Sequence, residues 1–359
     1  MGEKNSCREC FARSGGVRNK RISKFLLFSS LAGVVEWYTR ATQNRVSQGM
    51  EVRVLSPAPM KKTKVLIILG PTASGKSDLA VRIAKKFKGE VISADSRQVY
   101  KGLDIGTGKI TEQEMRGVPH YLLDVADPRK YFSVAEYKRL ALLSLRYIET
   151  KKKLPIICGG TGFYIDTLIG KINLPEVPPN KVLRKKLEKF PVEKLYKMLL
   201  KKDPRRAKEI DHRNKVRIIR ALEIVEVLGK VPDLTPNPSP RRKERDEYVF
   251  IGIKPNQKDL EKRIYQRILK RLDGMIREAK KLKANKLSYT RMESLGLEYR
   301  YLARLLQKKI TQQEFIDQLF SAIKDYSKRQ MTWFRRNPKI KWFTPNEYGK
   351  IEKYLKTKL

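Results

Sequence analysis

The chain has 359 residues with 40% hydrophobic content, enough for a sizeable core and a second, smaller domain, and its three cysteines exclude a disulfide framework. Its 80 Lys and Arg outnumber its 38 Asp and Glu, and the formal charge of +42 is spread over most of the length. Because so basic a chain repels itself unless it meets a polyanion, nucleic acid is the first expected partner, and a solvated lysine-rich surface is the alternative.

Residues 1–59 differ in character from the rest of the chain. The apolar run at 25–35 is too short for a membrane span and lacks a small-residue cleavage site, so we expect neither a transmembrane helix nor a signal peptide. The lone Cys7 and Cys10 pair has no second pair to complete a zinc site, which favours a reducing cytoplasm. The tract that follows resembles a translated tRNA-gene region, so we expect 1–59 to be a non-native or disordered extension before a native start at Met60; a disordered basic arm is the alternative.

The stretch 65–77, VLIILGPTASGKS, joins an apolar run to a glycine-bounded loop. It fits the P-loop pattern G-x-x-x-x-G-K-[ST], whose backbone N–H groups wrap a phosphate while the next helix points its positive end inward. Lys76 adds a point charge and Ser77 a hydroxyl for Mg²⁺. The loop alone does not say whether the phosphate belongs to a nucleotide. The expected phosphate-binding residues are Gly70, Pro71, Thr72, Ala73, Ser74, Gly75, Lys76 and Ser77.

From residue 60 onward the chain alternates strand and helix signals. The expected elements are a strand at 65–69, a helix at 77–87, a strand at 90–94, a helix at 135–152 and a strand at 154–158. The second strand delivers Asp95 at its carboxyl end, where α/β sheets place their ligands, and the third runs into a Gly-Gly-Thr-Gly turn at 159–162. This order predicts an α/β fold with a doubly wound parallel sheet core of the P-loop type.

Between about 175 and 240 the sequence changes to basic helices framed by the proline-rich joints LPEVPPN and VPDLTPNPSP. Helical spacing is visible at 183–190, 192–201 and 214–228, a strand signal follows at 248–253, and from 259 to the end the chain reads as basic helix. The expected division is therefore a first core part at 60–175, an inserted, mostly helical domain at 176–240, and a second core part with helical C-terminal region at 241–359.

Six motifs in order carry a family resemblance: GPTASGKS, ISADSRQVYKGLDIGTGK, HYLLDV, CGGTGFYI, RIIRALE and KRQMTWF. Together they resemble the bacterial tRNA dimethylallyltransferases, also called tRNA isopentenyltransferases, from residue 64 to 343. The resemblance implies transfer of a dimethylallyl group from dimethylallyl diphosphate to N6 of the adenosine 3′ to the anticodon, position 37. It also implies a monomer that binds the tRNA anticodon arm, with no membrane partner, and a P-loop that holds the donor diphosphate and not a nucleoside triphosphate.

The residues allow this chemistry to be rebuilt. An exocyclic adenine amine is a poor nucleophile, so a base must take its proton as the C–N bond forms, and Asp95 is the expected base. Its alternative roles are to cap the next turn or to hold Mg²⁺ through water. Lys76, Ser77 with Mg²⁺, and the backbone around Gly75 would stabilise the leaving diphosphate. Thr161 matches the family's active-site threonine, and an ordinary turn threonine is the alternative.

Further binding residues follow from the family pattern. Arg217 and Arg220 lie three apart on one helical face and match arginines that contact tRNA, and Arg184 matches another such position. Apart from the family pattern, Arg263 and Arg267 lie four residues apart and would bring charge onto the diphosphate as an arginine clamp does. For every arginine a solvated surface position is the alternative. The segment matching the family's contacts to the target nucleotides comprises Asp95, Ser96, Arg97 and Gln98, together with Thr161.

The sequence departs from the family pattern at two places, and three other functions are alternatives to prenyl transfer to tRNA. Where many relatives have Gly-Tyr-Lys-Glu the chain has Gly296-Leu297-Glu298-Tyr299, and it lacks the C-terminal zinc-finger pattern of the eukaryotic enzymes. A small-molecule P-loop kinase would share the loop but has no use for the charge. A non-enzymatic RNA-binding protein would explain the charge but not Asp95 beside a phosphate loop. Prenylation of free adenine nucleotides remains a third alternative, against which the basic insertion argues.

Overall fold

The computed structural model describes residues 63–233 and 246–359. The expected N-terminal extension at 1–59 and most of the second proline-rich joint lie outside the described residues. Among the helices within the described ranges, none combines the length and the apolar composition that crossing a bilayer requires.

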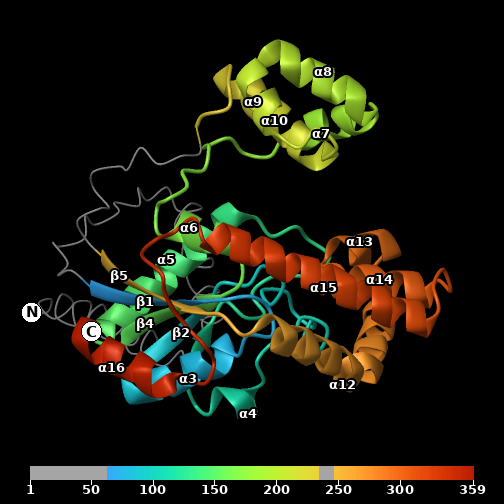
Figure 1. Cartoon of the computed structure of the whole chain (residues 1–359). Helices are drawn as coiled ribbons and strands as arrows, with labels where there is room; N and C mark the ends of the chain where they lie inside the picture. Colours follow the sequence, from blue (N-terminus) through green and yellow to red (C-terminus); the bar gives the residue numbers. More distant parts are fainter. Residues whose placement is uncertain (1–62, 234–245) are drawn as a thin grey trace, which may run out of the picture. The chain divides into compact units, whose positions relative to one another are not determined.

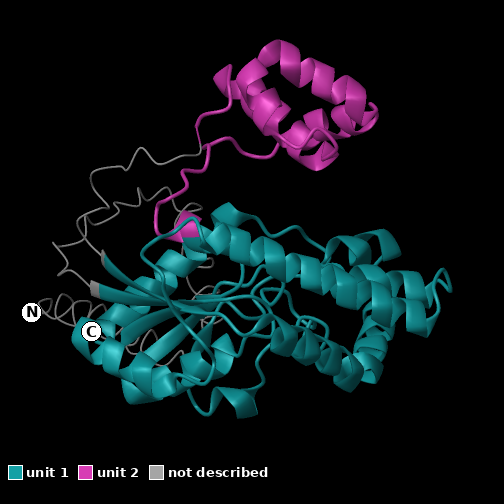
Figure 2. Ribbon diagram, in the orientation of Figure 1, with its two compact units in different colours: residues 1–165, 244–359 teal, residues 166–243 magenta. Residues whose placement is uncertain are grey.

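The chain forms two compact units, drawn in different colours in Figure 2. Unit 1 consists of residues 1–165 and 244–359, and unit 2 of residues 166–243. The insertion that the sequence places at 176–240 falls inside unit 2. Unit 1 therefore comes from two stretches of chain that are far apart in the sequence.

Unit 1 is built on a six-stranded, wholly parallel sheet in the order β3-β2-β4-β1-β5-β6 (Figure 1). The strands are β1 (Thr63–Leu69), β2 (Gly89–Ser93), β3 (His120–Tyr121), β4 (Leu154–Gly159), β5 (Asp246–Ile253) and β6 (Lys341–Phe343). The register sets Leu69 opposite Gly159, and Ser93 opposite Cys158. Because parallel strands end at a common edge, the loops after β1, β2 and β4 leave the sheet side by side.

Helices cover both faces of the sheet, so the predicted doubly wound α/β core is confirmed. Leu66 and Ile68 of β1 belong to one apolar cluster with residues of α3 (Lys76–Lys86) and α16 (Tyr348–Lys358). Figure 1 shows α5 (Val134–Thr150) on the opposite face. A strand covered on both faces needs apolar residues at every position, which explains the unbroken apolar run at 65–69 of β1.

The expectation of helix from 259 to the end is wrong at β6. This strand pairs with β5 and sets Trp342 opposite Gly252, where the missing Cβ leaves room for the indole ring. A strand of three residues is too short for an alternating pattern to show in the sequence. It forms because it pairs with β5, almost a hundred residues earlier in the chain.

The C-terminal helices of unit 1 form their own core beyond the sheet. They are α12 (Gln257–Ala284), α13 (Tyr289–Ser294), α14 (Leu297–Leu306) and α15 (Gln312–Phe334). Their buried side chains cluster with Val99 and Leu103, which follow β2 in the chain. The segment after β2 is thereby packed against α12, α14 and α15. Two short helices complete the strand connections, namely α4 (Glu112–Met115) and α6 (Gly162–Leu168).

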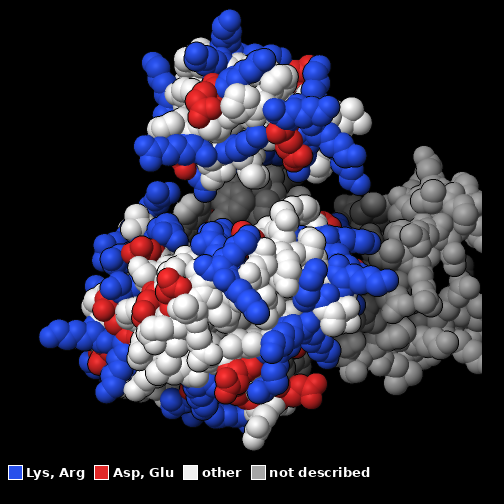
Figure 3. Space-filling view, turned by 90° about the vertical axis from the view of Figure 1, so that its right-hand side faces the viewer, with Lys and Arg blue, Asp and Glu red and all other residues white. Residues whose placement is uncertain are grey.

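Unit 2 is a small helical body with its own apolar core. It contains α7 (Lys181–Glu188), α8 (Val192–Lys202), α9 (Pro204–Glu209) and α10 (Lys215–Leu228). Leu195 and Leu199 of α8 cluster with Ile218 and Leu222 of α10, and both pairs follow helical spacing. Lys and Arg side chains cover much of the face of unit 2 seen in Figure 3.

Candidate active site

The phosphate loop follows β1 directly and ends at the start of α3. Gly75 lies at φ 85°, a left-handed conformation that favours glycine, and it is the N-cap of α3. The Lys76 ammonium donates to the Pro71 carbonyl at 3.1 Å. The Ser74 hydroxyl is buried and has no hydrogen-bond partner among the described residues, while Ser77 is exposed in the first helical turn. A buried hydroxyl without a protein partner in the phosphate loop can donate a hydrogen bond to an anionic ligand.

The loops after β2 and β4 are bonded to each other next to the phosphate loop. Gly159 lies so close to the Ala94 backbone that a side chain would not fit. The Thr161 N–H donates to the Ala94 carbonyl at 3.1 Å, and Thr161 Oγ1 accepts from the Ser96 N–H at 3.1 Å. Asp95, half-buried between them, accepts from the Arg97 N–H at 2.9 Å. The predicted base and the predicted threonine therefore share one edge of the sheet.

Gln330 of α15 bridges the two glycine-rich loops, and the sequence reasoning did not single it out as a site residue. Its Oε1 accepts from the Thr72 N–H at 2.9 Å, and its Nε2 donates to the Gly160 carbonyl at 2.8 Å. The only sequence signal was its place in the KRQMTWF motif. Because this side chain is buried, both hydrogen bonds are kept from competition with water.

A second group of cations comes from α12. Gly108, in the loop before α4, faces the guanidinium groups of both Arg267 and Arg271. Burial lowers the pKa of Arg267, and the carboxylates of Glu298 and Asp95 act in the opposite direction. Burial, and then the positive charge of Arg267, lower the pKa of Arg271 to about 10. Two crowded guanidinium groups are unfavourable unless an anion joins them.

Arg271 was missed by the sequence reasoning, which paired Arg267 with Arg263. Arg263 is an exposed residue one turn earlier in α12, and its assignment to the diphosphate stays a prediction. The Nη1 of Arg271 is instead buried and without a hydrogen-bond partner in the described part of the chain. Spacing by four along a helix fits 263, 267 and 271 equally, so only the packing against Gly108 distinguishes them.

Electrostatic coupling connects these groups to the phosphate loop. Burial lowers the pKa of the Lys76 ammonium. The nearby Asp95 carboxylate raises this pKa, and the positive charge of Arg267 lowers it. Burial raises the pKa of the Glu298 carboxyl, whereas the positive charges of Arg267 and Arg97 lower it. Lys76, Arg267 and Arg271, all half-buried, thus form a cationic group near the Asp95 turn, and we call it the cation cluster. Its chemistry fits a polyanionic ligand such as a diphosphate.

Arg97 and Gln98 connect the Asp95 turn to the surrounding elements. The exposed Arg97 donates to the Ser294 carbonyl at 3.4 Å, and Gln98 Nε2 donates to the Gly108 carbonyl at 3.3 Å. Among the described residues, no three His, Cys, Asp or Glu side chains gather as a metal site. A hard cation at this edge would therefore be held mainly by ligand oxygens and a hydroxyl, as Mg²⁺ commonly is at phosphates.

Comparison with known proteins places this arrangement in a family. Residues 98–337 match the profile of the IPP transferase family. A tRNA dimethylallyltransferase of Thermoanaerobacter sp. (strain X514) is 41% identical over 306 residues, covering 82% of this chain and 95% of that protein. The crystal structure of the tRNA isopentenylpyrophosphate transferase from Bacillus halodurans is 36% identical, with a TM-score of 0.61, and covers 83% of this chain and 97% of that one.

The chain belongs to the tRNA dimethylallyltransferase family. A structure of a eukaryotic dimethylallyltransferase acting on tRNA is also similar, with 26% identity, a TM-score of 0.67 and coverage of 80% of this chain and 75% of that one. The family resemblance inferred from the six motifs is confirmed, and the chain is an enzyme of this family. Five of those motifs lie in unit 1, and RIIRALE lies on α10 of unit 2.

In unit 2 of this dimethylallyltransferase, two of the arginines expected at tRNA are also held by Glu223. The Glu223 carboxylate, buried at 1% side-chain exposure, accepts from Arg184 Nε at 2.7 Å and Nη2 at 2.6 Å, from Arg220 Nη1 at 3.3 Å, and from the Asn180 N–H at 2.8 Å. Arg217 is exposed on the first turn of α10. Arg217 is therefore the arginine of the three that is presented most freely to a polyanion.

Replacing Glu223 with Gln is expected to destabilise unit 2 by about 2–3 kcal/mol, below the range of about 3–5 kcal/mol for breaking a buried pair. The lower figure follows because the side chains of Arg184 and Arg220 keep 38% and 33% exposure and recover part of their hydration. Amide hydrogen exchange in the intact chain measures this, with Glu226→Gln as control, because the pair of Glu226 with Lys202 is exposed on both sides.

The same carboxylate predicts a pH dependence. Burial alone would raise the pKa of Glu223, but hydrogen bonds from Arg184 and the Asn180 N–H outweigh burial, so the pKa is lowered. A carboxyl whose folded pKa is depressed contributes stability above its unfolded pKa of about 4.3 and loses that contribution as the pH falls through the folded pKa. Protection of unit 2 in Glu223→Gln should therefore approach wild type below about pH 4. A difference that is constant with pH would contradict this.

Proposed function

We propose that this chain transfers the dimethylallyl group of dimethylallyl diphosphate to N6 of adenosine 37 in tRNA. The observation that carries the proposal is the cation cluster of Lys76, Arg267 and Arg271, set beside a half-buried carboxylate, Asp95, at the next strand end. A diphosphate satisfies the cations, and the carboxylate then stands where a nucleophile must lose a proton.

In the proposed reaction, N6 attacks C1 of the donor while the bond from C1 to the diphosphate oxygen breaks. Asp95 takes the proton that N6 releases, so the amine gains a C–N bond without retaining a positive charge. The leaving diphosphate carries away the electron pair of the broken bond, and the cation cluster stabilises its growing charge. Thr161 fixes the Ser96 N–H and thereby the turn that carries Asp95.

Mg²⁺ is the proposed cofactor, and the residues present fit it. Ser77 offers an exposed hydroxyl in the first turn of α3, at the position a P-loop uses for this ion. When bound, Mg²⁺ would neutralise negative charge on the diphosphate. The chain's own contribution is to hold the diphosphate with loop N–H groups, Ser74 and Lys76, all of which lie in or directly beside the phosphate loop.

The proposed RNA partner is the anticodon arm. Its target base must leave the stack of the loop for N6 to reach Asp95, and single-stranded loops permit this at the lowest cost. Arg97 and Gln98 follow Asp95 and are proposed to contact neighbouring nucleotides, as are Arg184, Arg217 and Arg220 in unit 2. The charge of +42 supports a phosphate-binding surface of this kind.

The direct test supplies the purified chain with dimethylallyl diphosphate labelled in the prenyl group, Mg²⁺ and an anticodon stem-loop RNA. We expect one labelled group per RNA at N6 of adenosine 37, measured by nuclease digestion and mass spectrometry. A stem-loop with inosine at 37 is the matched control, because it keeps the ring but lacks the exocyclic amine. Excess ATP is expected to compete poorly.

Two results would move the assignment elsewhere. Phosphate release from ATP without prenyl transfer would favour the small-molecule kinase. Prenylation of free adenosine monophosphate at a rate above that of the stem-loop would favour the free-nucleotide enzyme. The basic face of unit 2 favours an RNA substrate, because neither a small-molecule kinase nor a free-nucleotide prenyltransferase needs such a surface (Figure 3).

A further inference from the structure

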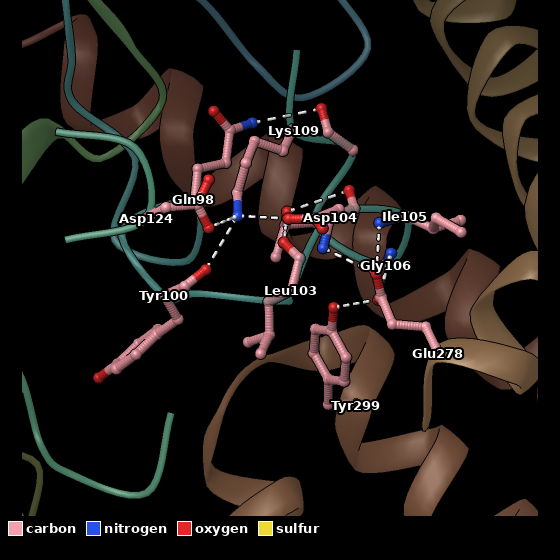
Figure 4. A network of polar contacts seen from close by, with 12 residues as sticks. Gln98, Tyr100, Leu103, Asp104, Ile105, Gly106, Lys109, Asp124, Glu278 and Tyr299 are labelled. Atoms are coloured by element: carbon pink, nitrogen blue, oxygen red, sulfur yellow. Dashed lines mark hydrogen bonds and ion pairs between the residues drawn. The ribbon is translucent and has the colours of Figure 1, made fainter. Parts of the chain in front are cut away.

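A rigid loop lies between the Asp95 turn and the α12 arginines. This loop, residues 103–109 with the sequence LDIGTGK, is called the GTGK loop here. The Lys109 side chain, which is only 5% exposed, forms ion pairs with Asp104 and Asp124 at 2.5 Å each and donates to the Tyr100 carbonyl at 2.9 Å (Figure 4). Buried charge with every partner in place fixes a loop far better than exposed hydrogen bonds do.

The side chain of Glu278 on α12 binds the backbone of the same loop. Its carboxylate accepts from the N–H groups of Asp104 and Ile105 at 2.8 Å each and of Gly106 at 3.0 Å (Figure 4). The Tyr299 hydroxyl donates to the same carboxylate at 2.5 Å. The Tyr299 ring is fully buried and lies where a Cβ of Gly106 would be. The ring and the Glu278 carboxylate together therefore fix the position of the loop relative to α12 and α14.

The far end of the GTGK loop touches the cation cluster. The Thr107 carbonyl accepts from Arg267 Nη2 at 3.3 Å, and Gly108 faces the guanidinium groups of both Arg267 and Arg271. Along α12, Glu278 lies about 10 Å from Arg271 and about 16 Å from Arg267 at about 1.5 Å per residue. Its carboxylate is occupied by the three loop N–H groups and the Tyr299 hydroxyl, so we expect it to act on the arginines through the loop.

The turn that carries Asp95 has anchors that do not involve Glu278. The Ser96 N–H is held by Thr161 at 3.1 Å, and the Gln98 carbonyl accepts from the Asp124 N–H at 3.3 Å. Gln98 also reaches the Gly108 carbonyl, but its own backbone does not depend on that bond. Releasing Glu278 should therefore disturb the arginines more than the Asp95 turn.

We propose that Glu278 and Tyr299 are positioning residues for the donor: they hold the GTGK loop so that Arg267 and Arg271 meet the diphosphate of dimethylallyl diphosphate. The inference rests on the proposed function and adds two residues that do not touch substrate. It also gives a role to Tyr299, which stands in the segment where this chain departs from the Gly-Tyr-Lys-Glu pattern of many relatives.

The test compares Glu278→Gln with wild type in the full chain. A carboxamide keeps the size of the side chain but turns an NH₂ group toward backbone N–H donors, so the loop loses part of its support. We expect affinity for dimethylallyl diphosphate and for inorganic diphosphate, measured by calorimetry, to fall about 10–100-fold, the scale of losing roughly one hydrogen bond from a charged group. The KM for the donor should rise accordingly and kcat should fall, because the same arginines stabilise the leaving diphosphate, while the KM for the stem-loop stays within about threefold.

Two further variants keep the result interpretable. Glu261→Gln makes the same change on α12, where Glu261 bonds only its helix neighbour Gln257 in the described structure, and it should leave donor affinity unchanged. Tyr299→Phe removes one hydrogen bond but keeps the buried ring against Gly106, so it should fold and weaken donor binding about 3–10-fold, the cost of roughly one hydrogen bond.

The outcomes separate the inference from the function on which it rests. Wild type that fails to bind dimethylallyl diphosphate would overturn the proposed function. Wild type that binds, with folded Glu278→Gln and Tyr299→Phe binding equally well, would overturn the positioning role alone. A loss of kcat with donor affinity unchanged would also overturn it, because the loop would then serve the Asp95 turn and not the arginines.

Discussion

Asp95→Asn is expected to lower the single-turnover rate of prenyl transfer by about 10²–10⁴-fold, the usual range for a general base. The amide keeps the acceptor for the Arg97 N–H, which lies 2.9 Å from Oδ1, so the turn should hold its shape. What is lost is the proton acceptor for N6. The rate is measured by rapid mixing of the enzyme, saturating labelled donor and the anticodon stem-loop.

The matched control for this variant is Asp78→Asn in the first turn of α3, because Asp78 is exposed and pairs only across the surface with Arg116. Binding of the donor and of the stem-loop should be nearly unchanged in Asp95→Asn. If that variant transferred the prenyl group at close to the wild-type rate, Asp95 would not be the base, and Glu298, whose pKa is raised by burial, would be the next group to examine.

Arg271→Gln is expected to lower the transfer rate by about 10²–10³-fold, comparable with removal of one donor that stabilises a developing anion. The buried Nη1 of Arg271 has no protein partner in the described part of the chain, so its expected partner is the leaving diphosphate. Donor affinity should fall as well, because the diphosphate is charged before the reaction starts. The measurement is the single-turnover rate together with calorimetric donor binding.

The same variant should not lose thermal stability. Arg271 lies beside Arg267, and the positive charge of that neighbour is the second cause, after burial, of its lowered pKa. Removing one of two crowded cations relieves repulsion, so the melting temperature without ligand should stay level or rise. Arg263 is exposed one turn earlier in α12, so Arg263→Gln should lower the rate far less than Arg271→Gln and leave stability unchanged. A large loss of rate in Arg263→Gln and none in Arg271→Gln would reverse the assignment.

Local sequence signals predicted the parts of the site that are continuous in the chain. The phosphate loop follows β1 directly, and Asp95 and Thr161 each follow the end of a buried strand, so the rule for parallel sheets brings them to one edge. The pairing of β4 with β1 on one side and with β2 on the other then brings the three loops close together. These positions were predictable because one strand and one turn decide each of them.

The remaining site residues depend on packing between distant elements. Gln330 meets Gly160 across 170 residues, and Glu278 meets Ile105 across 173. Helical spacing marked Arg263 and Arg271 alike and did not tell which one faces Gly108. Likewise, the buried Glu223 that holds Arg184 and Arg220 looked like any other acidic residue of a basic helix. A single sequence does not show which of its distant residues will contact one another in the fold.

The order of strands in the sheet has a consequence for synthesis on the ribosome. β1 lies between β4 and β5, and β5 is made only after the whole of unit 2 has been synthesised. Until then one edge of the apolar β1 strand has no partner, which exposes a surface prone to aggregation. Unit 2, whose helices contact near neighbours in sequence, can fold early, whereas the core must wait. Nascent chains truncated before β5 are thus the form of this enzyme most in need of a chaperone.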